Sequence, residues 1–190
     1  MSKSPLLDKS RHIIKNCCIF HMAAGRHKGV SDVKKKIAVL KQVSLFAGLD
    51  DQTIEQLASI SELRTFKAGQ PVFTEGEADA SLFIVISGVV KIDKQVNAEQ
   101  QQTLHQLKDG EFFGEISFVR GGEHIASAQA VHDAEVLLIR RTEFDKLAVR
   151  SPAVGYRIML RMAGQMATLL RNMDEKFVEL VSYIYGRSKK

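Results

Sequence analysis

The spacing of apolar residues along the chain changes at two points, and the changes separate three kinds of structure. Over residues 31–60 apolar residues recur at intervals of three and four, which is typical of helices with one buried face. Between residues 63 and 140, short apolar runs are separated by glycines and polar breaks, which is typical of β-strands. From residue 151 the helical spacing returns. The pattern therefore predicts a β domain with helices before and after it.

The predicted helices have recognisable first residues. The first begins near Ser31, and its apolar face consists of Val33, Ile37, Leu40 and Val43. Asp51 is expected to cap a second helix, whose apolar face consists of Ile54, Leu57 and Ile60. Thr142 is expected to cap a short helix over residues 143–149. Ser151 followed by Pro152 then predicts the start of a long helix, with serine as the cap and proline at the first helical position.

Seven short strands are expected in the middle of the chain. They are Leu63–Phe66, Val72–Phe73, Ser81–Ile86, Val89–Asp93, Gln102–Leu107, Ile125–Val131 and Glu135–Arg140. Seven or eight short strands at this spacing favour a closed or rolled β structure. Leu82–Ile86 is apolar on both faces, so it should be a central, buried strand.

The long C-terminal helix meets no strong breaker until Gly186. Its methionines and one leucine repeat at three and four, which predicts a coiled-coil seam made of Met159, Met162, Met166, Leu169 and Met173. A small β domain cannot cover so long a helix, so we expect a homodimer formed through residues 152–180.

The net charge of +5 is unevenly distributed, because both ends of the chain are basic and the middle is mildly acidic. Residues 1–36 hold nine basic and two acidic residues, and residues 187–190 hold three basic ones. Residues 37–186 hold 15 basic and 20 acidic residues, a net charge of −5. We therefore expect a basic leader (1–36), a mildly acidic β domain (37–150), the long helix (151–186) and a basic tail (187–190). Solvated tails are the commonest role for such ends, and contact with nucleic acid or an anionic membrane is the alternative.

The composition excludes several classes of protein. No apolar run approaches the roughly 18 to 20 residues of a membrane-spanning helix. Cys17 and Cys18 are adjacent, which suits neither a disulfide framework nor a structural zinc site, so we expect a cytoplasmic protein. His105, His124 and His132 lie far apart in sequence, which argues against a metal-dependent enzyme. We expect no enzyme activity and no cofactor.

The most informative stretch is the run from Phe112 to Phe118. Gly114 is expected to open a single helical turn, whose free backbone N–H groups favour an anion. The carboxylate of Glu115 cannot hold an anion, but it can accept a hydrogen bond from a sugar hydroxyl. A phosphate beside a sugar hydroxyl indicates a nucleotide.

Three glycine-containing motifs carry a resemblance to a known family. They are Phe-x-x-Gly-x-x-Val-x-x-x-Gly at 66–76, Phe-Ile-Val-x-x-Gly-x-Val at 83–90 and Leu-x-x-Gly-x-Phe-Phe-Gly-Glu-Ile-Ser at 107–117. In this order and spacing, the chain from about Leu40 to the middle of the last helix resembles the cyclic nucleotide-binding domain family. The resemblance implies an eight-stranded β-roll (a double-stranded β-helix, jelly-roll-like) with flanking helices and a long C-terminal helix, mainly β in class.

The resemblance also implies a ligand site, with a cyclic nucleotide (cAMP or cGMP) as ligand rather than cofactor. Its residues would be Gly114, Glu115, Ile116, Ser117, His124, Ile125, Ala126 and Ser127. Glu115 would bind the ribose hydroxyl, and backbone amides would surround the phosphate. The family has an arginine for the phosphate at the position of His124, so this chain departs from the pattern there. Histidine is a weaker donor, and its charge depends on pH.

Two functions stay open after this departure. One is a regulatory module that senses a cyclic nucleotide or a related anionic nucleotide. The other is a degenerate domain that acts as a dimerising interaction scaffold without nucleotide. Sequence-specific DNA binding is not expected, because no helix-turn-helix unit follows the long helix in this sequence.

Overall fold

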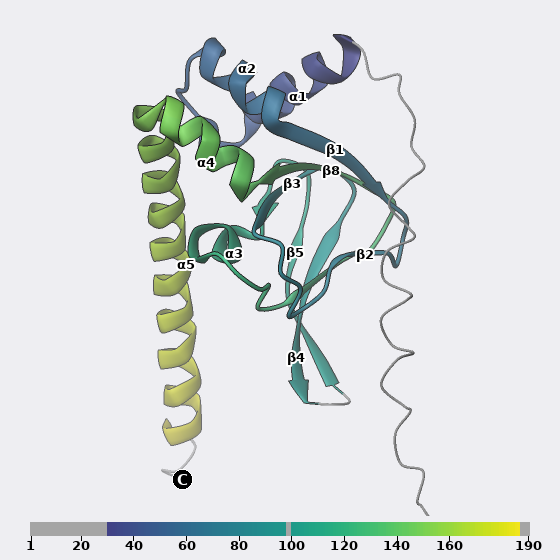
Figure 1. Ribbon diagram of the computed structural model, residues 1–190. Coiled ribbons are helices and arrows are strands. Elements are labelled where there is room, and N and C mark those ends of the chain that lie inside the picture. The colour runs from purple at the N-terminus through teal and green to yellow at the C-terminus, as the bar shows by residue number, and fades with distance from the viewer. Residues whose placement is uncertain (1–29, 98–99, 187–190) are drawn as a thin grey trace, which may run out of the picture.

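The computed structural model describes residues 30–97 and 100–186 (Figure 1). The helices are α1 (Val30–Gln42), the 3-10 turn η1 (Ser44–Phe46), α2 (Asp51–Ile60), α3 (Glu115–Arg120), α4 (Arg141–Arg150) and α5 (Pro152–Gly186). The strands are β1 (Ser61–Phe66), β2 (Pro71–Phe73), β3 (Ser81–Ser87), β4 (Val90–Asn97), β5 (Gln100–Leu107), β6 (Phe112–Phe113), β7 (Ser127–Ala130) and β8 (Ala134–Arg140). Most of the predicted basic leader, the adjacent cysteines and the basic tail lie outside the described residues.

The eight strands form two four-stranded sheets in which every pairing is antiparallel. The strand orders are β1-β8-β3-β6 and β2-β7-β4-β5. β3 lies between β8 and β6, and its residues 81–85 are buried, so the prediction of a central, buried strand is confirmed. The expected class, mainly β with an eight-stranded roll, flanking helices and a long C-terminal helix, is confirmed as well.

Three strand predictions need correction. β4 ends at Asn97, four residues after the expected end at Asp93, because its pairing with β5 continues as far as Gln100. β6 was not predicted, because two residues are too few to show a periodicity; the strand exists because Phe113 pairs with Phe83 and Phe112 with Ile84. The strand expected from Ile125 begins only at Ser127, the residue that pairs with Asp93 of β4. The two residues before it form a bend.

Two helix caps also differ from the prediction. Asp50, not Asp51, caps α2, because its carboxylate accepts a hydrogen bond from the Thr53 N–H at 2.7 Å. α4 begins at Arg141, one residue before the expected cap Thr142, and its start has no side-chain cap. The Arg141 N–H instead donates to the carbonyl of Ala80 at 3.0 Å, so contact with the segment before β3 fixes this helix end. The predicted start of α5 at Pro152 is correct.

The interior contains two separate apolar clusters. The first, which we call the helical core, is formed by Leu40, Val43, Leu45, Phe46, Ile54, Leu57, Ala58, Leu82, Ile84, Phe118, Leu137, Ile139, Phe144, Leu147, Ile158 and Met162. The second, which we call the barrel core, is formed by Phe66, Phe73, Phe83, Val85, Val90, Phe113, Ala128, Ala130, Ala134, Val136 and Leu138. β3 and β8 supply both clusters from opposite faces, since successive side chains of a strand point to opposite sides.

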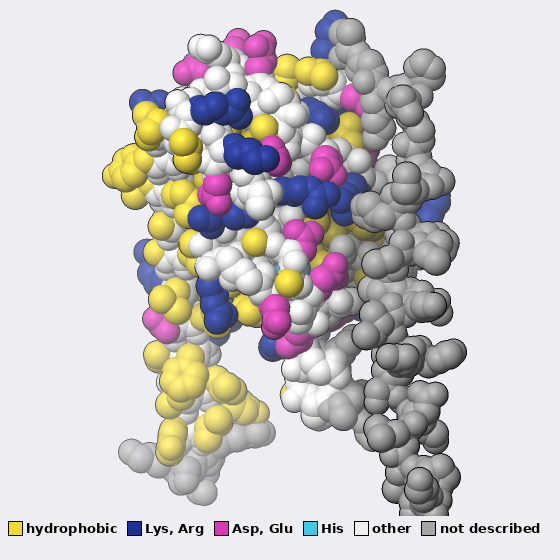
Figure 2. Space-filling model, in the orientation of Figure 1, with side chains coloured by type: hydrophobic (Ala, Val, Ile, Leu, Met, Phe, Trp, Pro, Cys, Tyr) yellow, Lys and Arg dark blue, Asp and Glu magenta, His cyan; other side chains and the backbone are white. Residues whose placement is uncertain are grey.

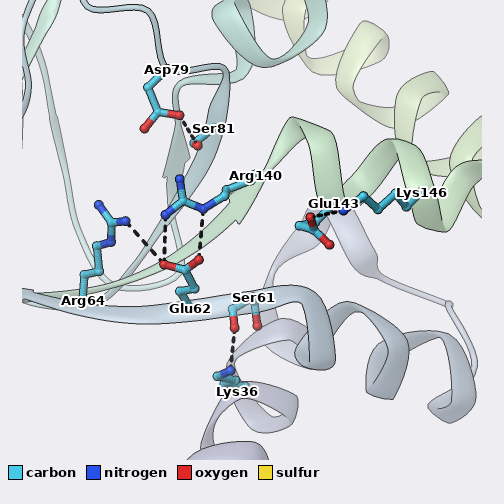
Figure 3. Close-up of polar contacts among 9 residues, drawn as sticks. All are labelled: Lys36, Ser61, Glu62, Arg64, Asp79, Ser81, Arg140, Glu143 and Lys146. Carbon is cyan, nitrogen blue, oxygen red and sulfur yellow. Dashed lines mark hydrogen bonds and ion pairs between the residues drawn. The ribbon is translucent and has the colours of Figure 1, made fainter. Parts of the chain in front are cut away.

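Polar contacts fasten the first strand to its neighbours (Figure 3). The carboxylate of Glu62 on β1 accepts two hydrogen bonds from the guanidinium of Arg140 on β8, at 3.0 and 3.2 Å. Arg64 reaches the same carboxylate at 3.4 Å. The Nζ of Lys36 on α1 donates to the Ser61 carbonyl at 2.5 Å. These contacts join α1, β1 and β8 across one side of the helical core.

The long helix α5 differs between its two halves. In the first half Ile158 and Met162 are buried in the helical core, and Met159 packs against it. Met162 is therefore unavailable to a second helix and Met159 is already half-covered, so the first half of the predicted seam is wrong. The second half runs past the domain (Figure 1), and every residue from 170 to 180 is exposed. Apolar side chains crowd this end of the helix in Figure 2.

Candidate ligand site

The turn into α3 can be made only by glycine. Gly114 has φ of 81°, in the left-handed region. A Cβ at this position would lie 2.5 Å from the carbonyl oxygen of Ser81 and 3.0 Å from the Phe83 ring. The backbone of the turn therefore lies directly against β3, and α3 starts where β6 ends.

Glu115 is the first residue of α3, and most of its side chain is shielded from water. Burial raises the pKa of its carboxyl above the usual 4.5, while its own backbone hydrogen bond and the nearby His105 of β5 act in the opposite direction. A carboxylate removed from water gains more than an exposed one from a new hydroxyl donor. Glu115 is therefore placed to accept a hydrogen bond from a ligand.

His124 lies inside the molecule, beside the barrel core, and only 3% of its surface is exposed. Its ring stacks on that of Phe73, with centroids 3.6 Å apart and an interplanar angle of 6°. Its Nδ1 lies 2.8 Å from the hydroxyl oxygen of Ser117 on α3. Its other ring nitrogen, Nε2, is buried and has no hydrogen-bond partner among the described residues. Buried polar atoms without a partner are rare and often belong to functional sites.

The main chain of His124 is held by the turn between β2 and β3. Its N–H donates to the Glu77 carbonyl at 2.9 Å, and its carbonyl accepts from the Gly76 N–H at 2.8 Å. Burial lowers the pKa of the ring below 6.5, and the carboxylates of Asp79 and Glu77 only partly oppose this. Figure 3 shows the Asp79 carboxylate accepting a hydrogen bond from the Ser81 hydroxyl. At neutral pH the ring is therefore uncharged.

A bridge of polar contacts holds residues 125–127. The Nζ of Lys94 on β4 donates to the Ile125 carbonyl and to the Glu75 carboxylate, each at 2.5 Å. The Glu75 N–H donates to the Ser127 hydroxyl at 2.9 Å. Ala126 between them is buried. The segment expected to bind a phosphate is therefore attached to β4 and to the turn that follows β2.

The structure brings the predicted site residues together in two short segments. Gly114, Glu115, Ile116 and Ser117 form the start of α3, and residues 124–127 lie opposite them, joined by the contact between Ser117 and His124. The side chain of Ile125 is 43% exposed, and its carbonyl accepts a hydrogen bond from Lys94. Sequence reasoning missed Phe73, Glu75, Glu77 and Lys94, since none of them belongs to a motif at the site.

Cavities and metal-ligand clusters do not suggest another site. One surface hollow is lined by residues 65–67, 87 and 133–135, and another by residues 145, 146, 149 and 150. Neither includes α3 or residues 124–127, where aromatic rings fill the interior. Across the described ranges, no cluster of three or more His, Cys, Asp or Glu side chains could hold a metal ion. Nor does any helix in those ranges have the length and hydropathy to span a bilayer.

Comparison with known proteins gives one consistent result. Residues 63–151 match the family model described as the cyclic nucleotide-binding domain. The chain is 33% identical over 150 residues to the cyclic AMP receptor protein of Thermus thermophilus, covering 79% of this chain and 67% of that protein. It is 29% identical over 133 residues to the cGMP-dependent protein kinase egl-4 of Caenorhabditis briggsae, covering 68% of this chain but only 17% of the kinase.

A solved structure agrees with this result. The Thermus thermophilus catabolite activator protein is 33% identical, with a TM-score of 0.64, over 73% of this chain and 63% of that one. The aligned part therefore shares both sequence and fold, whereas about a third or more of each relative's length has no counterpart in the matched region.

Proposed function

The chain belongs to the cyclic nucleotide-binding domain family, and from this premise we propose that it is a non-enzymatic regulatory module that binds cAMP or cGMP. The observation that carries the proposal is the pairing of two segments, the start of α3 with its half-buried Glu115 and residues 124–127 opposite. Relatives named as a cyclic AMP receptor and a cGMP-dependent kinase support the ligand class.

Each half of the site has a proposed role. Glu115 accepts a hydrogen bond from the ribose hydroxyl. Backbone amides of Gly114, Ile116, Ser117, Ala126 and Ser127 surround the phosphate. His124 stands where the family has an arginine, and an uncharged imidazole cannot supply the charge-assisted, two-point contact that a guanidinium makes with a phosphate. The affinity for a cyclic nucleotide is therefore weak.

Calorimetry with cAMP and with cGMP tests the proposal. His124→Arg should tighten binding by roughly ten- to a hundredfold, because a hydrogen bond to a charged group contributes about 1.5 to 3 kcal/mol. Glu115→Ala should weaken it, and His132→Gln, which changes a histidine in the turn before β8, should not alter it. If neither the wild type nor His124→Arg binds either nucleotide, the proposal is wrong.

The second candidate is a dimerising scaffold without nucleotide. It is favoured by the sealed position of His124, because the ring already fills the interior beside α3. In this case binding would be absent in both proteins, while self-association would be unchanged. The same titrations therefore separate the two candidates.

We also propose a homodimer through α5, formed by a face different from the methionine seam. Apolar residues that are exposed recur at four and three along the outer face of the helix, at Tyr156, Leu160, Ala163, Ala167 and Leu170. Phe177 and Ile184 follow Leu170 on this face at intervals of seven residues. Asp174, four residues after Leu170, is a charged residue at a position where the pattern has an apolar one. This is the heptad spacing of a two-helix seam, and it lies away from the side buried on the helical core.

Sedimentation of point variants tests the dimer better than truncation. A chain ending at Arg150 would lack Ile158 and Met162, and would therefore damage the helical core. Leu170→Glu and Phe177→Glu should give monomers at tens of micromolar. Asn172→Glu, which adds a charge to the same turn on the side of the helix away from the proposed seam, should remain dimeric. A monomeric wild type at that concentration would contradict the proposal.

We propose further that the described part of the chain does not recognise DNA by sequence. Residues 37–186 have a net charge of −5, and any affinity for DNA should come from the basic leader. Such binding depends on counterion release, so it should fall steeply with salt. A sequence-dependent shift that resists salt would contradict this.

A further inference from the structure

Resting on the proposed function, we propose that His124 couples binding of the ligand's phosphate to uptake of one proton. The neutral ring closes the phosphate end of the site, and the protonated ring, paired with the phosphate, opens it. Affinity for an anionic ligand then depends on pH, which an arginine at this position would not allow.

The packing of His124 is the geometric basis. Its ring is held on one face by Phe73, and its Nδ1 is held by the Ser117 hydroxyl at 2.8 Å. Its Nε2 is sealed from solvent without a partner among the described atoms. A phosphate cannot reach Nε2 while the ring stays in this position. A ring protonated on both nitrogens has two donors, so Nε2–H requires an acceptor that the closed site does not offer.

Ser117 binds one ring nitrogen of His124 and leaves the other for a ligand. Its hydroxyl lies 2.8 Å from Nδ1 of His124 and 3.1 Å from the Gly114 carbonyl. If the hydroxyl donates to Nδ1, the neutral ring carries its proton on Nε2. If it donates to the carbonyl, Nδ1–H donates to the hydroxyl and Nε2 is bare. In both arrangements Nε2 is the atom left for a ligand, so Ser117 acts as a positioning residue.

Charged groups around the ring set the direction of the coupling. Asp79 and Glu77, from the loop between β2 and β3, favour the protonated ring, and burial opposes it more strongly. Glu115 lies on the same helix as Ser117, Lys94 binds the Ile125 carbonyl on the next residue, and Glu123 precedes the histidine in the chain. A bound phosphate adds negative charge next to the ring and raises its proton affinity.

By reciprocity, protonation must then raise the affinity for the phosphate by the same factor. Binding should strengthen as pH falls, by up to about tenfold per pH unit between the pKa values of the free and bound states. Above that range the slope should vanish, because the ring is neutral before and after binding.

The test combines a ligand-free and a ligand-bound measurement on the full chain. In the ligand-free protein, NMR titration of the histidine ring should give a pKa below 6.5 for His124, and the ring-current shift from Phe73 should disappear on protonation. Calorimetry with cAMP in two buffers of different ionisation enthalpy should show an uptake approaching one proton at a pH between the two pKa values. Uptake should be close to zero for His124→Arg and His124→Gln. The control variant His132→Gln should behave as the wild type, and Ser117→Ala should change the ring tautomer and the pH profile.

The outcomes separate this inference from the proposed function. If cAMP binds without proton uptake, the coupling is wrong and the nucleotide site stands. If cAMP binds with uptake that persists in His124→Gln, another group takes the proton and the inference is also wrong. If neither the wild type nor His124→Arg binds, the proposed function fails and the coupling with it.

Discussion

The two apolar clusters are built from opposite faces of the same strands, yet they differ in the side chains that border them. The helical core is closed by aliphatic side chains and by an edge-to-face pair of rings, Phe118 and Phe144, with centroids 5.2 Å apart. The barrel core contains three neighbouring aromatic rings, Phe73, Phe83 and Phe113, and the ring of His124 lies against the first of them. One cluster is apolar throughout, and the other has a titratable group at its edge.

The presence of a buried polar side chain does not by itself distinguish the surroundings of His124. Asp93 of β4 is also buried, at 5% exposure, but its carboxylate accepts hydrogen bonds from the Lys91 ammonium at 2.7 Å and the Thr103 hydroxyl at 2.6 Å. His124 has a partner for one nitrogen only among the described residues. A buried polar group whose hydrogen bonds are all made stabilises the fold. A buried group that lacks a partner destabilises it, and a ligand or a proton that supplies or removes an interaction can change that cost.

The largest expected effect is in the helical core. Leu57→Ala should lower the free energy of unfolding by about 2 to 5 kcal/mol, because it removes a fully buried side chain and leaves a cavity. Chemical denaturation measures this. Nucleotide affinity of the folded fraction should not change, since Leu57 belongs to the other cluster. An affinity loss comparable to that of Glu115→Ala would show that the two clusters are not independent.

Gly114→Ala should be the next most severe change, and Gly110→Ala is its matched control. Both glycines have positive φ, 81° and 84°, so both substitutions cost about 1 to 2 kcal/mol of backbone strain. Only at Gly114 would the new Cβ also collide with the Ser81 carbonyl and the Phe83 ring. The difference between the two variants in denaturation therefore measures how closely α3 lies against β3. Equal losses would mean that the turn can move away without cost.

His124→Phe tests the unsatisfied nitrogen through stability. The pKa of His124 is lowered in the folded protein, so the unfolded chain binds the proton more tightly, and the wild type loses stability as pH falls below about 6.5. Phenylalanine retains the stack on Phe73 and cannot titrate. The variant should be as stable as the wild type at pH 8 within about 1 kcal/mol, and should lose less stability between pH 7 and pH 5. Parallel pH profiles for the two proteins would contradict this account.

Glu115→Gln should give the smallest change in stability, with the opposite sign. Burial raises the pKa of Glu115 above 4.5, so its ionised form is disfavoured in the folded state. Stability contributed by the protonated form is lost as pH rises through the folded pKa, and glutamine should therefore stabilise the ligand-free protein at pH 7 but not at pH 4. Denaturation at the two pH values measures this. A loss of nucleotide affinity in the same variant would show that the site retains a strained carboxylate for binding.

The sequence contained most of the architecture because the signals are local. Glycine-bounded strands and the serine–proline start of α5 were predicted from neighbouring residues alone. β6 was not, because a two-residue strand exists only through its pairing with β3. The cap of α2 was assigned one residue too late, since Asp50 and Asp51 are equally plausible until the Thr53 contact is known.

The sequence predicted which residues lie close together, but not the surroundings of the His124 ring. Motif spacing located Gly114, Glu115 and His124. It could not show that His124 faces inward, because its ring partner Phe73 is 51 positions earlier in the chain, on a strand of the other sheet from β6 and β3. The first half of the methionine seam failed for a related reason: helical spacing shows that residues share a face, but not which surface covers that face.

The exposed second half of α5 has a consequence for the dynamics of the chain. Isolated helices of up to about 15 residues are marginal in water without packing. The segment 171–186 is only slightly longer, and its residues 171–180 are all exposed. In a single copy, backbone amides of this segment should exchange with deuterated water within seconds, while those around Ile158 and Met162 remain protected. Their exchange rates should fall as protein concentration rises, so the far end of α5 would report how many copies are paired at any moment.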